Sequence, residues 1–223
     1  MAATTALTES DVSLTPLVIS RLGLISYSEA LDLQRKVHSN VVTGSAQNTF
    51  FLLEHPDVYT AGKRTIESER PQDGTPVIDV DRGGKITWHG PGQLVGYPIV
   101  KLAKPSELVG FVRELENGLI EVCKELGIPA FQIAGRTGIW VGLPGLERKI
   151  AAIGIRVASG VSMHGFAINV NPNLSAFDRI IPCGIVDVTV TSISQELKKD
   201  VSVNQILPIV EKHISQSLAK VSA

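Results

Sequence analysis

Hydrophobic and polar residues recur along this chain with two different periods, and these divide it into predicted strands and helices. Short apolar runs at residues 17–22 and 48–54 predict strands, because both are rich in β-branched or aromatic residues. Between them, Ser28 is the expected N-cap of a helix that runs to about Val42 and stops at Gly44. The first 54 residues therefore predict a strand, a helix and a second strand.

The clearest helical pattern follows Ser106, the expected N-cap. Its apolar residues recur with the 3.6-residue period of a helix and make one face, formed by Leu108, Phe111, Val112, Leu115, Leu119, Val122, Cys123 and Leu126. Gly127 and Pro129 end the helix. Because Cys123 lies on the apolar face, we interpret it as a small buried hydrophobic residue.

Most of the remaining chain is predicted to form short strands, at residues 58–63 (an edge strand), 77–80, 94–100, 138–142, 150–157 and 164–170. The last three are closely spaced, which favours antiparallel hairpins. Residues 176–181 predict a helical turn, and residues 188–196 a strand or the start of a helix. A final helix is expected over residues 207–221, with Pro208 at its first position. The predicted fold class is α+β, with a mixed, largely antiparallel sheet packed with helices.

Composition limits the class of protein. With 43% apolar and 19% charged residues, the 223-residue chain can build a core, and we expect a flexible tail at residues 1–16 followed by a single domain at 17–223. The net charge of −1 and the lack of a basic stripe argue against a nucleic-acid partner, and no apolar run is long enough for a membrane span. Two cysteines and no targeting pattern favour a reducing, cytoplasmic location. No metal-ligand spacing is present.

A glycine-dense stretch between two of the predicted strands is the strongest candidate for a binding site. It contains five glycines in 14 positions, together with the side chains of Arg82, Lys85 and His89. Glycines let a ligand approach the backbone closely. One interpretation is two tight turns that bracket a strand. The other is a binding wall with these three side chains at its rim, and it is not a phosphate loop because the required spacing is absent. The polar loop at residues 64–74 is expected to be a solvated connection rather than a mobile flap.

Cys183 and Lys149 are the candidates for covalent chemistry. Cys183 lies between a proline and a glycine, which constrains the backbone on one side and leaves it permissive on the other. A reactive thiolate needs a nearby positive charge to lower its pKa, and Lys149 could supply it. Lys149 could equally end a strand and reach water. His89 and His164 are alternative bases for Cys183.

Five motifs together resemble the lipoyl(octanoyl) transferase family. They are Leu53-Glu-His-Pro-Asp-Val-Tyr-Thr-Ala-Gly, Arg82-Gly-Gly-Lys-Ile-Thr-Trp-His-Gly-Pro-Gly-Gln-Leu-Val-Gly-Tyr-Pro, Lys149-Ile-Ala-Ala-Ile-Gly, His164-Gly-Phe-Ala-Ile-Asn and Pro182-Cys-Gly. They occur in the family's order and approximate spacing over residues 17–197. The N-terminal tail and the final helix carry no such signature.

The resemblance implies a fold similar to the catalytic domain of biotin and lipoate protein ligases. It also implies transfer of an octanoyl group from octanoyl-acyl carrier protein, without ATP, a cofactor or a metal, to a lysine of lipoyl domains. By match to the motifs, Cys183 would be the nucleophile that forms an acyl-thioester, and Lys149 would lower its pKa and handle protons. The residues implied to line the acyl site are Arg82, Gly83, Gly84, Lys85, Ile86, Thr87, Trp88, His89, Ala152, Ile153, Gly154, Gly165, Phe166 and Ala167.

The implied acceptors are the lipoyl domains of 2-oxoacid dehydrogenase complexes and the glycine cleavage H protein. Arg64, Arg70 and Arg148 are candidate contacts for the carrier. Three other functions stay open: an ATP-dependent ligase on the same fold, an amidotransferase that moves octanoate between lipoyl-type domains, and a catalytically silent acyl-binding or carrier-binding protein.

Overall fold

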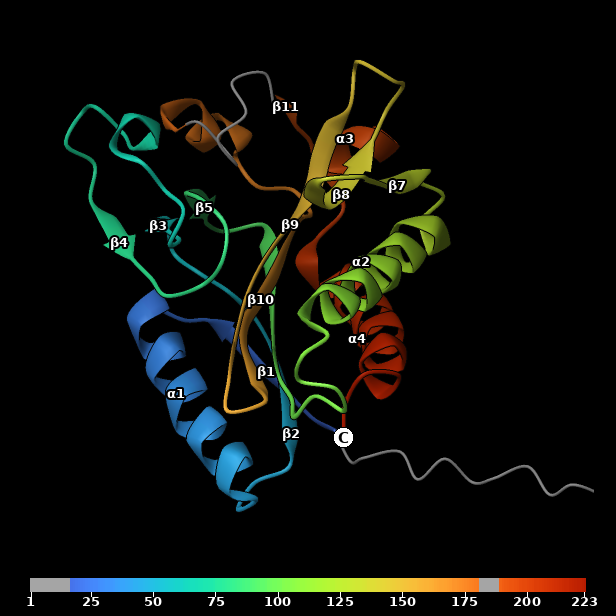
Figure 1. Ribbon diagram of the computed structural model, residues 1–223. Coiled ribbons are helices and arrows are strands. Elements are labelled where there is room, and N and C mark those ends of the chain that lie inside the picture. Colours follow the sequence, from blue (N-terminus) through green and yellow to red (C-terminus); the bar gives the residue numbers. More distant parts are fainter. Residues whose placement is uncertain (1–16, 181–188) are drawn as a thin grey trace, which may run out of the picture.

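A large mixed sheet lies at the centre of the molecule, with helices on both faces (Figure 1). The structure is a computed structural model that describes residues 17–180 and 189–223. The main path of the sheet runs through β1 (Leu17–Leu24), β2 (Asn48–Glu54), β6 (Gln93–Ile99), β10 (Val161–Asn169), β9 (Arg148–Ala158), β8 (Arg136–Val141) and β7 (Ala130–Ile133). β1 pairs with β2 in parallel, and the other neighbours on this path are antiparallel. The predicted α+β class and largely antiparallel sheet are confirmed.

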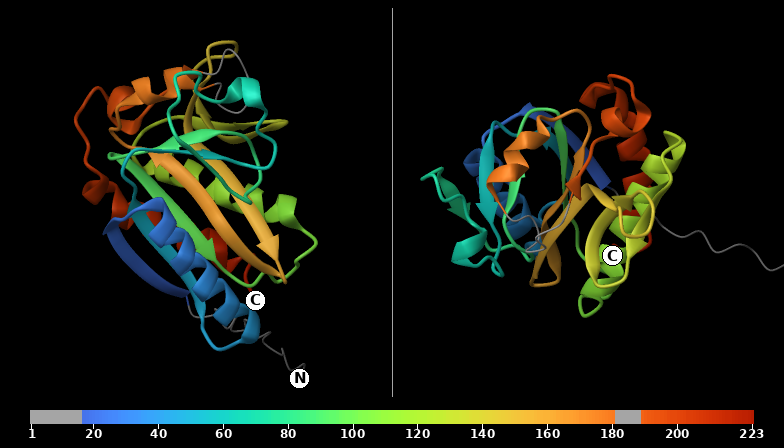
Figure 2. Two further views of the ribbon diagram at one scale, coloured as in Figure 1. Left: turned by 90° about the vertical axis from the view of Figure 1, so that its left-hand side faces the viewer. Right: turned by 90° about the horizontal axis from the view of Figure 1, so that it is seen from above.

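A second sheet has the order β4-β3-β5 and is formed by β4 (Val77–Asp79), β3 (Val58–Ala61) and β5 (Thr87–His89). Seen from above, it lies on the opposite side of the main sheet from helices α2 and α4 (Figure 2). The prediction that residues 58–63 form an edge strand is wrong, because β3 pairs on both sides. The hydrophobic pattern did not reveal the pairing of β3 with β5, because β5 is a three-residue strand inside the glycine-dense stretch.

Helix α1 (Tyr27–Thr43) packs on one face of the main sheet, against β6 and β10. Its N-cap is Ser26, which accepts a hydrogen bond from the backbone N–H of Glu29, and not the predicted Ser28. Both serines are followed by helix-compatible residues, but only Ser26 has a glutamate three positions later to complete a capping box. The expected stop at Gly44 is confirmed, since this glycine takes a left-handed φ of 75°.

Helices α2 (Leu108–Glu125) and α4 (Val203–Ala219) cover the other face of the main sheet and pack on each other. The N-cap of α2 is Glu107 rather than Ser106, and it makes no side-chain cap hydrogen bond. The prediction that α4 starts at Pro208 is also wrong. Its apolar face begins at Val203, and burial of that face outweighs the loss of the hydrogen bond that proline cannot donate. Within the described residues, no helix is both long and apolar enough to cross a membrane.

The remaining described elements are short. They are the 3-10 helices η1 (Glu67–Glu69) and η2 (Leu174–Arg179), the strand β11 (Thr189–Val190) and the helix α3 (Ile193–Leu197). β11 pairs with β9 in parallel, and Ser192 caps α3. Residues 188–196 were expected to be strand or helix, and the described part contains both. Strand β7 was missed because the turn after α2 leaves only four residues for it, too few for a clear alternation.

Candidate active site

A cavity of about 340 Å³ lies between the main sheet, the second sheet and the start of α1. Among the described residues it is lined by Lys149 and by most of the residues implied to hold an acyl chain: Arg82, Gly84, Lys85, Ile86, Thr87, His89, Ala152, Ile153, Gly154, Gly165, Phe166 and Ala167. Gly83 and Trp88 are not among the lining residues. The Trp88 ring packs against Phe177 instead, in a separate hydrophobic cluster. Cys183 lies outside the described residues.

The floor of the cavity is formed by β9 and β10, where close contact between strands requires glycine. A Cβ at Gly165 would lie 1.9 Å from the backbone oxygen of Gly96 on β6. A Cβ at Gly96 would in turn lie 2.3 Å from the ring of Phe166. Larger side chains at either glycine would force β6 and β10 apart. These two glycines therefore allow β6 and β10 to pair closely beneath the cavity.

A β-bulge in β9 turns Lys149 toward the cavity. On β8, Ile139 pairs with Ala151 of β9 and Trp140 pairs with Lys149, so Ile150 has no partner on β8. A bulge changes which face a following side chain occupies. Both Ile150 and Ala151 are consequently buried in the core, while Lys149 and Ala152 line the cavity. A regular strand would place Lys149 and Ala152 on opposite faces.

Lys149 is only 5% exposed. Its Nζ donates a hydrogen bond to the backbone oxygen of Thr137 at 3.2 Å and lies 4.6 Å from the centroid of the Trp140 ring. The alternative that Lys149 merely ends a strand and reaches water is therefore wrong. The sequence could not decide this, because burial of the lysine depends on β8 and on the bulge.

Arg82 is buried in the wall of the cavity, and its guanidinium group is bound mainly to backbone oxygens. It donates to the carbonyls of Gly83, Lys85 and Thr60 and to the hydroxyl of Thr60, at 2.8–3.1 Å. Its side chain passes close to Gly62 and Gly154, where a Cβ would lie 2.7 and 3.0 Å from it. Arg82 thus ties the glycine-dense loop to β3, and its charge stays at the cavity wall.

The polar loop between β3 and β4 is tied to the wall by an ion pair. Glu69 is 3% exposed and pairs with Lys85, and its carboxylate also accepts the backbone N–H of Ile66 at 3.1 Å. The expectation of a purely solvated connection is wrong at this position. A loop sequence without periodicity gave no sign that one of its glutamates is buried.

His89 belongs to a chain of hydrogen bonds that determines its tautomer. Asn169 donates to the carbonyl of Thr191, Gln93 donates to the Asn169 side-chain oxygen, and the Gln93 oxygen is left to accept from His89 Nδ1 at 2.7 Å. The proton of the neutral ring is therefore on Nδ1, and Nε2 is an acceptor. Burial lowers the pKa of His89 to about 3, so the ring is neutral at physiological pH.

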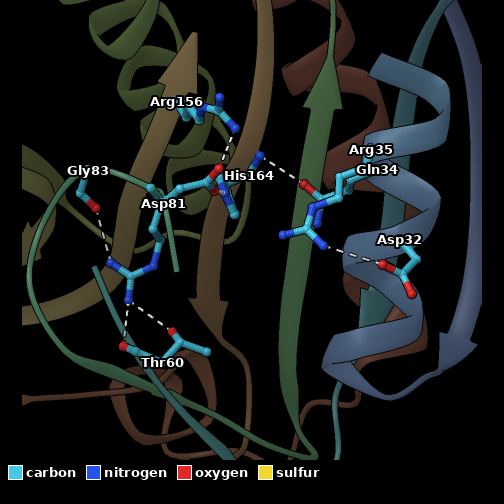
Figure 3. A network of polar contacts seen from close by, with 9 residues as sticks. Asp32, Gln34, Arg35, Thr60, Asp81, Gly83, Arg156 and His164 are labelled. Atoms are coloured by element: carbon cyan, nitrogen blue, oxygen red, sulfur yellow. Dashed lines mark hydrogen bonds and ion pairs between the residues drawn. The ribbon is translucent and has the colours of Figure 1, made fainter. Parts of the chain in front are cut away.

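His164 lies at the other end of the cavity from Lys149. It pairs with Ile155, and six residues of strand at about 3.3 Å each put Lys149 roughly 20 Å away along β9. Its Nε2 donates to Asp81 at 2.7 Å and its backbone N–H to Gln34 at 2.8 Å (Figure 3). These bonds stabilise a left-handed φ of 58°, and burial lowers the pKa of the ring.

Two tyrosines that the sequence did not single out also line the cavity. Tyr27 begins α1, and burial raises the pKa of its hydroxyl to about 12. Tyr97 donates to His55 Nε2 at 2.8 Å, because His55 Nδ1 already donates to the carbonyl of Ile25. Tyr97 belongs to the glycine-dense motif, so the motif itself could have drawn attention to it. Tyr27 carried no such signal.

The three arginines considered as carrier contacts differ in their surroundings. Arg64 lines the cavity. Arg70 forms ion pairs with Asp79 and Glu67, and Arg148 forms one with Glu196 at 2.8 Å. Cys123 is fully buried on α2, as predicted, and burial raises the pKa of its thiol to about 12. It therefore stays a protonated core residue. No group of three or more potential metal ligands occurs within the described residues.

Comparisons with known proteins identify the family of this chain. The family model of the lipoyl protein ligase A/B catalytic domain matches residues 26–215. The octanoyltransferase of Salinispora arenicola is 55% identical over 200 residues, which cover 89% of this chain and 94% of that protein. The octanoyltransferase of Acidothermus cellulolyticus is 55% identical over 197 residues, covering 88% and 89%. This chain belongs to the octanoyltransferase family.

Solved structures confirm the expected fold of this octanoyltransferase family member. The bipartite lipoate protein ligase of Thermoplasma acidophilum, studied with its E2 lipoyl domain, aligns with a TM-score of 0.68 and 13% identity over 92% of this chain and 83% of that one. The biotin protein ligase of Aquifex aeolicus, in complex with biotin and ATP, aligns with a TM-score of 0.53 and 18% identity over 91% and 71%. The fold that the sequence motifs implied is thereby confirmed.

Proposed function

We propose that the protein transfers an octanoyl group from the thioester of octanoyl-acyl carrier protein to a lysine of lipoyl domains, the first step of protein lipoylation. Family membership supports octanoyl transfer. The observation that carries the finer proposal is the buried Lys149 at one end of a cavity whose walls come from the family motifs. A buried lysine at this cavity can stabilise a thiolate in its charged form and accept a proton in its neutral form.

In the first step, the thiolate of Cys183 attacks the carbonyl carbon of the octanoyl thioester. A new C–S bond forms to Cys183, the bond to the carrier sulfur breaks, and the carrier thiolate leaves and takes up a proton. Lys149 in its ammonium form favours the thiolate before attack. Backbone amides near the cysteine would hold the oxyanion of the tetrahedral intermediate. Exchange of one thioester for another is nearly balanced, so this step needs neither ATP nor a cofactor.

In the second step, the amine of the acceptor lysine attacks the acyl-enzyme. An amide bond forms, the C–S bond to Cys183 breaks, and the attacking nitrogen loses a proton. Lys149 in its neutral form is the base that we assign to this proton. The same residue can thus serve both steps, because it changes protonation between them.

The cavity supplies binding energy for the acyl chain. Small residues on β9 and β10 leave the slot open, and Ile86, Ile153 and Phe166 give it apolar walls. Burial of each methylene contributes roughly 0.8 kcal/mol, so the slot can discriminate among chain lengths. The residues proposed to contact the chain are the motif residues that line the cavity, and Gly83 and Trp88 are proposed to support its wall from outside the lining.

The proposed acceptors are the lipoyl domains of 2-oxoacid dehydrogenase complexes and the glycine cleavage H protein. The archaeal ligase with a similar fold was studied with its own E2 lipoyl domain, which supports this class of acceptor. The proposed donor is octanoyl-acyl carrier protein. A cytoplasmic location stays a prediction.

Intact-mass spectrometry after incubation with octanoyl-acyl carrier protein, without ATP or acceptor, tests the proposal. We expect a covalent octanoyl adduct that maps to Cys183 and disappears when a lipoyl domain is added. Acceptor octanoylation that strictly requires ATP would instead identify an ATP-dependent ligase. Preference for an octanoylated lipoyl-type domain as donor would identify an amidotransferase, and no transfer under any condition a silent binding protein.

The role of Lys149 is tested by alkylation of Cys183 with iodoacetamide across a range of pH. In Lys149→Ala we expect slower alkylation at neutral pH, because the thiolate has lost its nearby cation. An unchanged alkylation profile would remove the role proposed for Lys149.

A further inference from the structure

The ammonium group of Lys149 is held by two features of one neighbouring strand, β8. Its Nζ donates to the Thr137 carbonyl at 3.2 Å and lies over the ring face of Trp140, 4.6 Å from the centroid. Trp140 is itself fully buried, and its Nε1 donates to the carbonyl of Arg136 at 3.2 Å. That hydrogen bond fixes the orientation of the indole ring. The ring face presented to Lys149 is therefore set by the strand and is not free to rotate.

The strand segment that carries both contacts is anchored by a carboxylate of helix α2. Gly138, in the middle of the segment, donates its backbone N–H to Glu116 Oε1 at 2.9 Å. Glu116 is fully buried and forms an ion pair with Arg113. Gly138 has a φ of 115°, and a Cβ there would lie 3.3 Å from Lys149 Cε and 2.6 Å from the Ala151 oxygen. The glycine makes room for the lysine, and the glutamate fixes the glycine.

These contacts suit a lysine that must change protonation. A carbonyl dipole and an aromatic face both attract an ammonium group, and the indole ring is the strongest aromatic partner for a cation. Neither of these two partners carries a full negative charge, so each attracts the ammonium group less strongly than a carboxylate would. Because Lys149 is buried, its ammonium group has lost hydrogen bonds to water, and these two contacts compensate for part of that loss.

We propose that Trp140 and Glu116 are positioning residues for Lys149: the indole face holds the ammonium group at the end of the cavity, and the carboxylate holds the strand segment that bears the indole. The inference rests on the proposed function, in which Lys149 exchanges protons with the reacting groups. Neither residue is among those that line the cavity. Both act through the position of Nζ.

Replacement of Trp140 tests the first part. We expect Trp140→Leu to lower kcat for octanoyl transfer at least tenfold and to shift the pH profile of kcat, with the donor KM changed less than threefold. Trp140→Phe keeps an aromatic face, so it should recover a large part of kcat and return the pH profile toward that of the parent protein. Leu119→Ala on α2 is the control, since Leu119 is a fully buried core residue that does not line the cavity. It should lower Tm but leave kcat and the pH profile of the folded protein unchanged.

Replacement of Glu116 tests the second part. Glu116→Gln keeps a side-chain oxygen that can accept the Gly138 N–H, and we expect kcat within about threefold of the parent value. Glu116→Ala removes the acceptor, and it should lower kcat and shift the pH profile in the same direction as Trp140→Leu. If Trp140→Leu does not fold, Glu116→Ala carries the test, with an expected loss of kcat and a shifted pH profile relative to Glu116→Gln.

Lys149→Ala separates a failure of this inference from a failure of the proposed function. If Lys149→Ala retains full transfer activity, the role of the lysine is wrong. If Lys149→Ala is inactive but folded variants of Trp140 and Glu116 keep the parent kcat and pH profile, only the positioning role is overturned. Loss of kcat in these variants with an unchanged pH profile and no recovery by Trp140→Phe would also overturn it, because that result indicates general destabilisation.

Discussion

At the scale of single residues, burial assigns one of the two cysteines in the sequence, Cys123, a structural role. Cys123 is fully buried among apolar side chains of α2, where burial keeps it protonated. Within the described residues, no cation contributes to the pKa of its thiol, and Cys123 does not line the cavity. Cys183, by contrast, was singled out by its flanking proline and glycine and by the family motif. The chemistry proposed for the protein therefore depends on one cysteine only.

Cys183→Ala should abolish octanoyl transfer while the protein stays folded, because the acyl-thioester can no longer form. Cys123→Ala should keep the transfer activity of the folded protein and destabilise it by about 1 kcal/mol, a typical value for a small loss of core volume. Transfer rates and urea unfolding of both variants check this. Equal activity loss in the two variants would contradict the separation of roles.

Gly165 is the residue at which the cavity floor is most sensitive to added volume. Gly165→Ala should destabilise the protein by about 3 kcal/mol, because the new Cβ would overlap the Gly96 oxygen and separate β6 from β10. Octanoyl transfer should fall with it. Gly110→Ala in α2 is the control with the opposite expected sign, since its Cβ meets nothing closer than 3.8 Å and alanine favours a helix by about 0.5–1 kcal/mol. Urea denaturation measures both. A neutral Gly165→Ala would contradict the requirement for glycine.

At the scale of elements, the start of α1 shows how one capping interaction sets a boundary that hydrophobic period leaves uncertain. Ser26 and Glu29 satisfy each other's backbone N–H groups, so the helix begins at Tyr27 and places that ring in the cavity. A start two residues later, as the sequence predicted, would leave Tyr27 outside the helix. The boundary of this helix thus affects the shape of the site.

Ser26→Ala should destabilise the protein by about 1 kcal/mol, the usual contribution of an N-cap hydroxyl. Ser28→Ala should change stability by less than about 0.5 kcal/mol, because Ser28 lies within the first turn of the helix and is exposed. The difference between the two variants in thermal or urea unfolding is the measurement. A larger effect at Ser28 would return the N-cap to the position first predicted.

At the scale of the whole molecule, three buried histidines make global stability depend on pH. His55, His89 and His164 all have a pKa lowered by burial, that of His89 to about 3. In the unfolded chain each histidine would have a pKa near 6.5. At a pH between its folded and its unfolded pKa, each histidine therefore binds more protons in the unfolded state than in the folded state. Stability is therefore greatest above the unfolded pKa and is lost as the pH falls from about 6.5 toward the folded values.

We expect the free energy of unfolding to decrease continuously from pH 7 to pH 4, with His89 alone accounting for about 3 kcal/mol at pH 4. Urea unfolding at several pH values measures this slope. His89→Gln should flatten it, because a group that does not titrate has replaced one that does. An identical slope in the variant would mean that His89 is accessible to protons in the folded state.

The sequence by itself determined the fold class, the main helices and the residues around which the cavity is built. Its strongest signals were local: an apolar face at helical period in α2, glycines wherever two backbones meet, and motifs whose order matches a family. Such features can be read from neighbouring positions because they depend on a few residues at fixed offsets. Gly44 as a helix stop and Cys123 as a core residue were predicted on that basis and are confirmed.

Only the tertiary structure decided what depends on contacts between distant segments. The bulge at Ile150 turns Lys149 into the cavity, and Trp140 on the neighbouring strand then covers its ammonium group. Glu69 is buried only because the loop folds back onto Lys85, and β3 lies inside its sheet only because β5 pairs with it. Pairing and burial arise from the relative placement of whole elements. No single stretch of sequence contains that information.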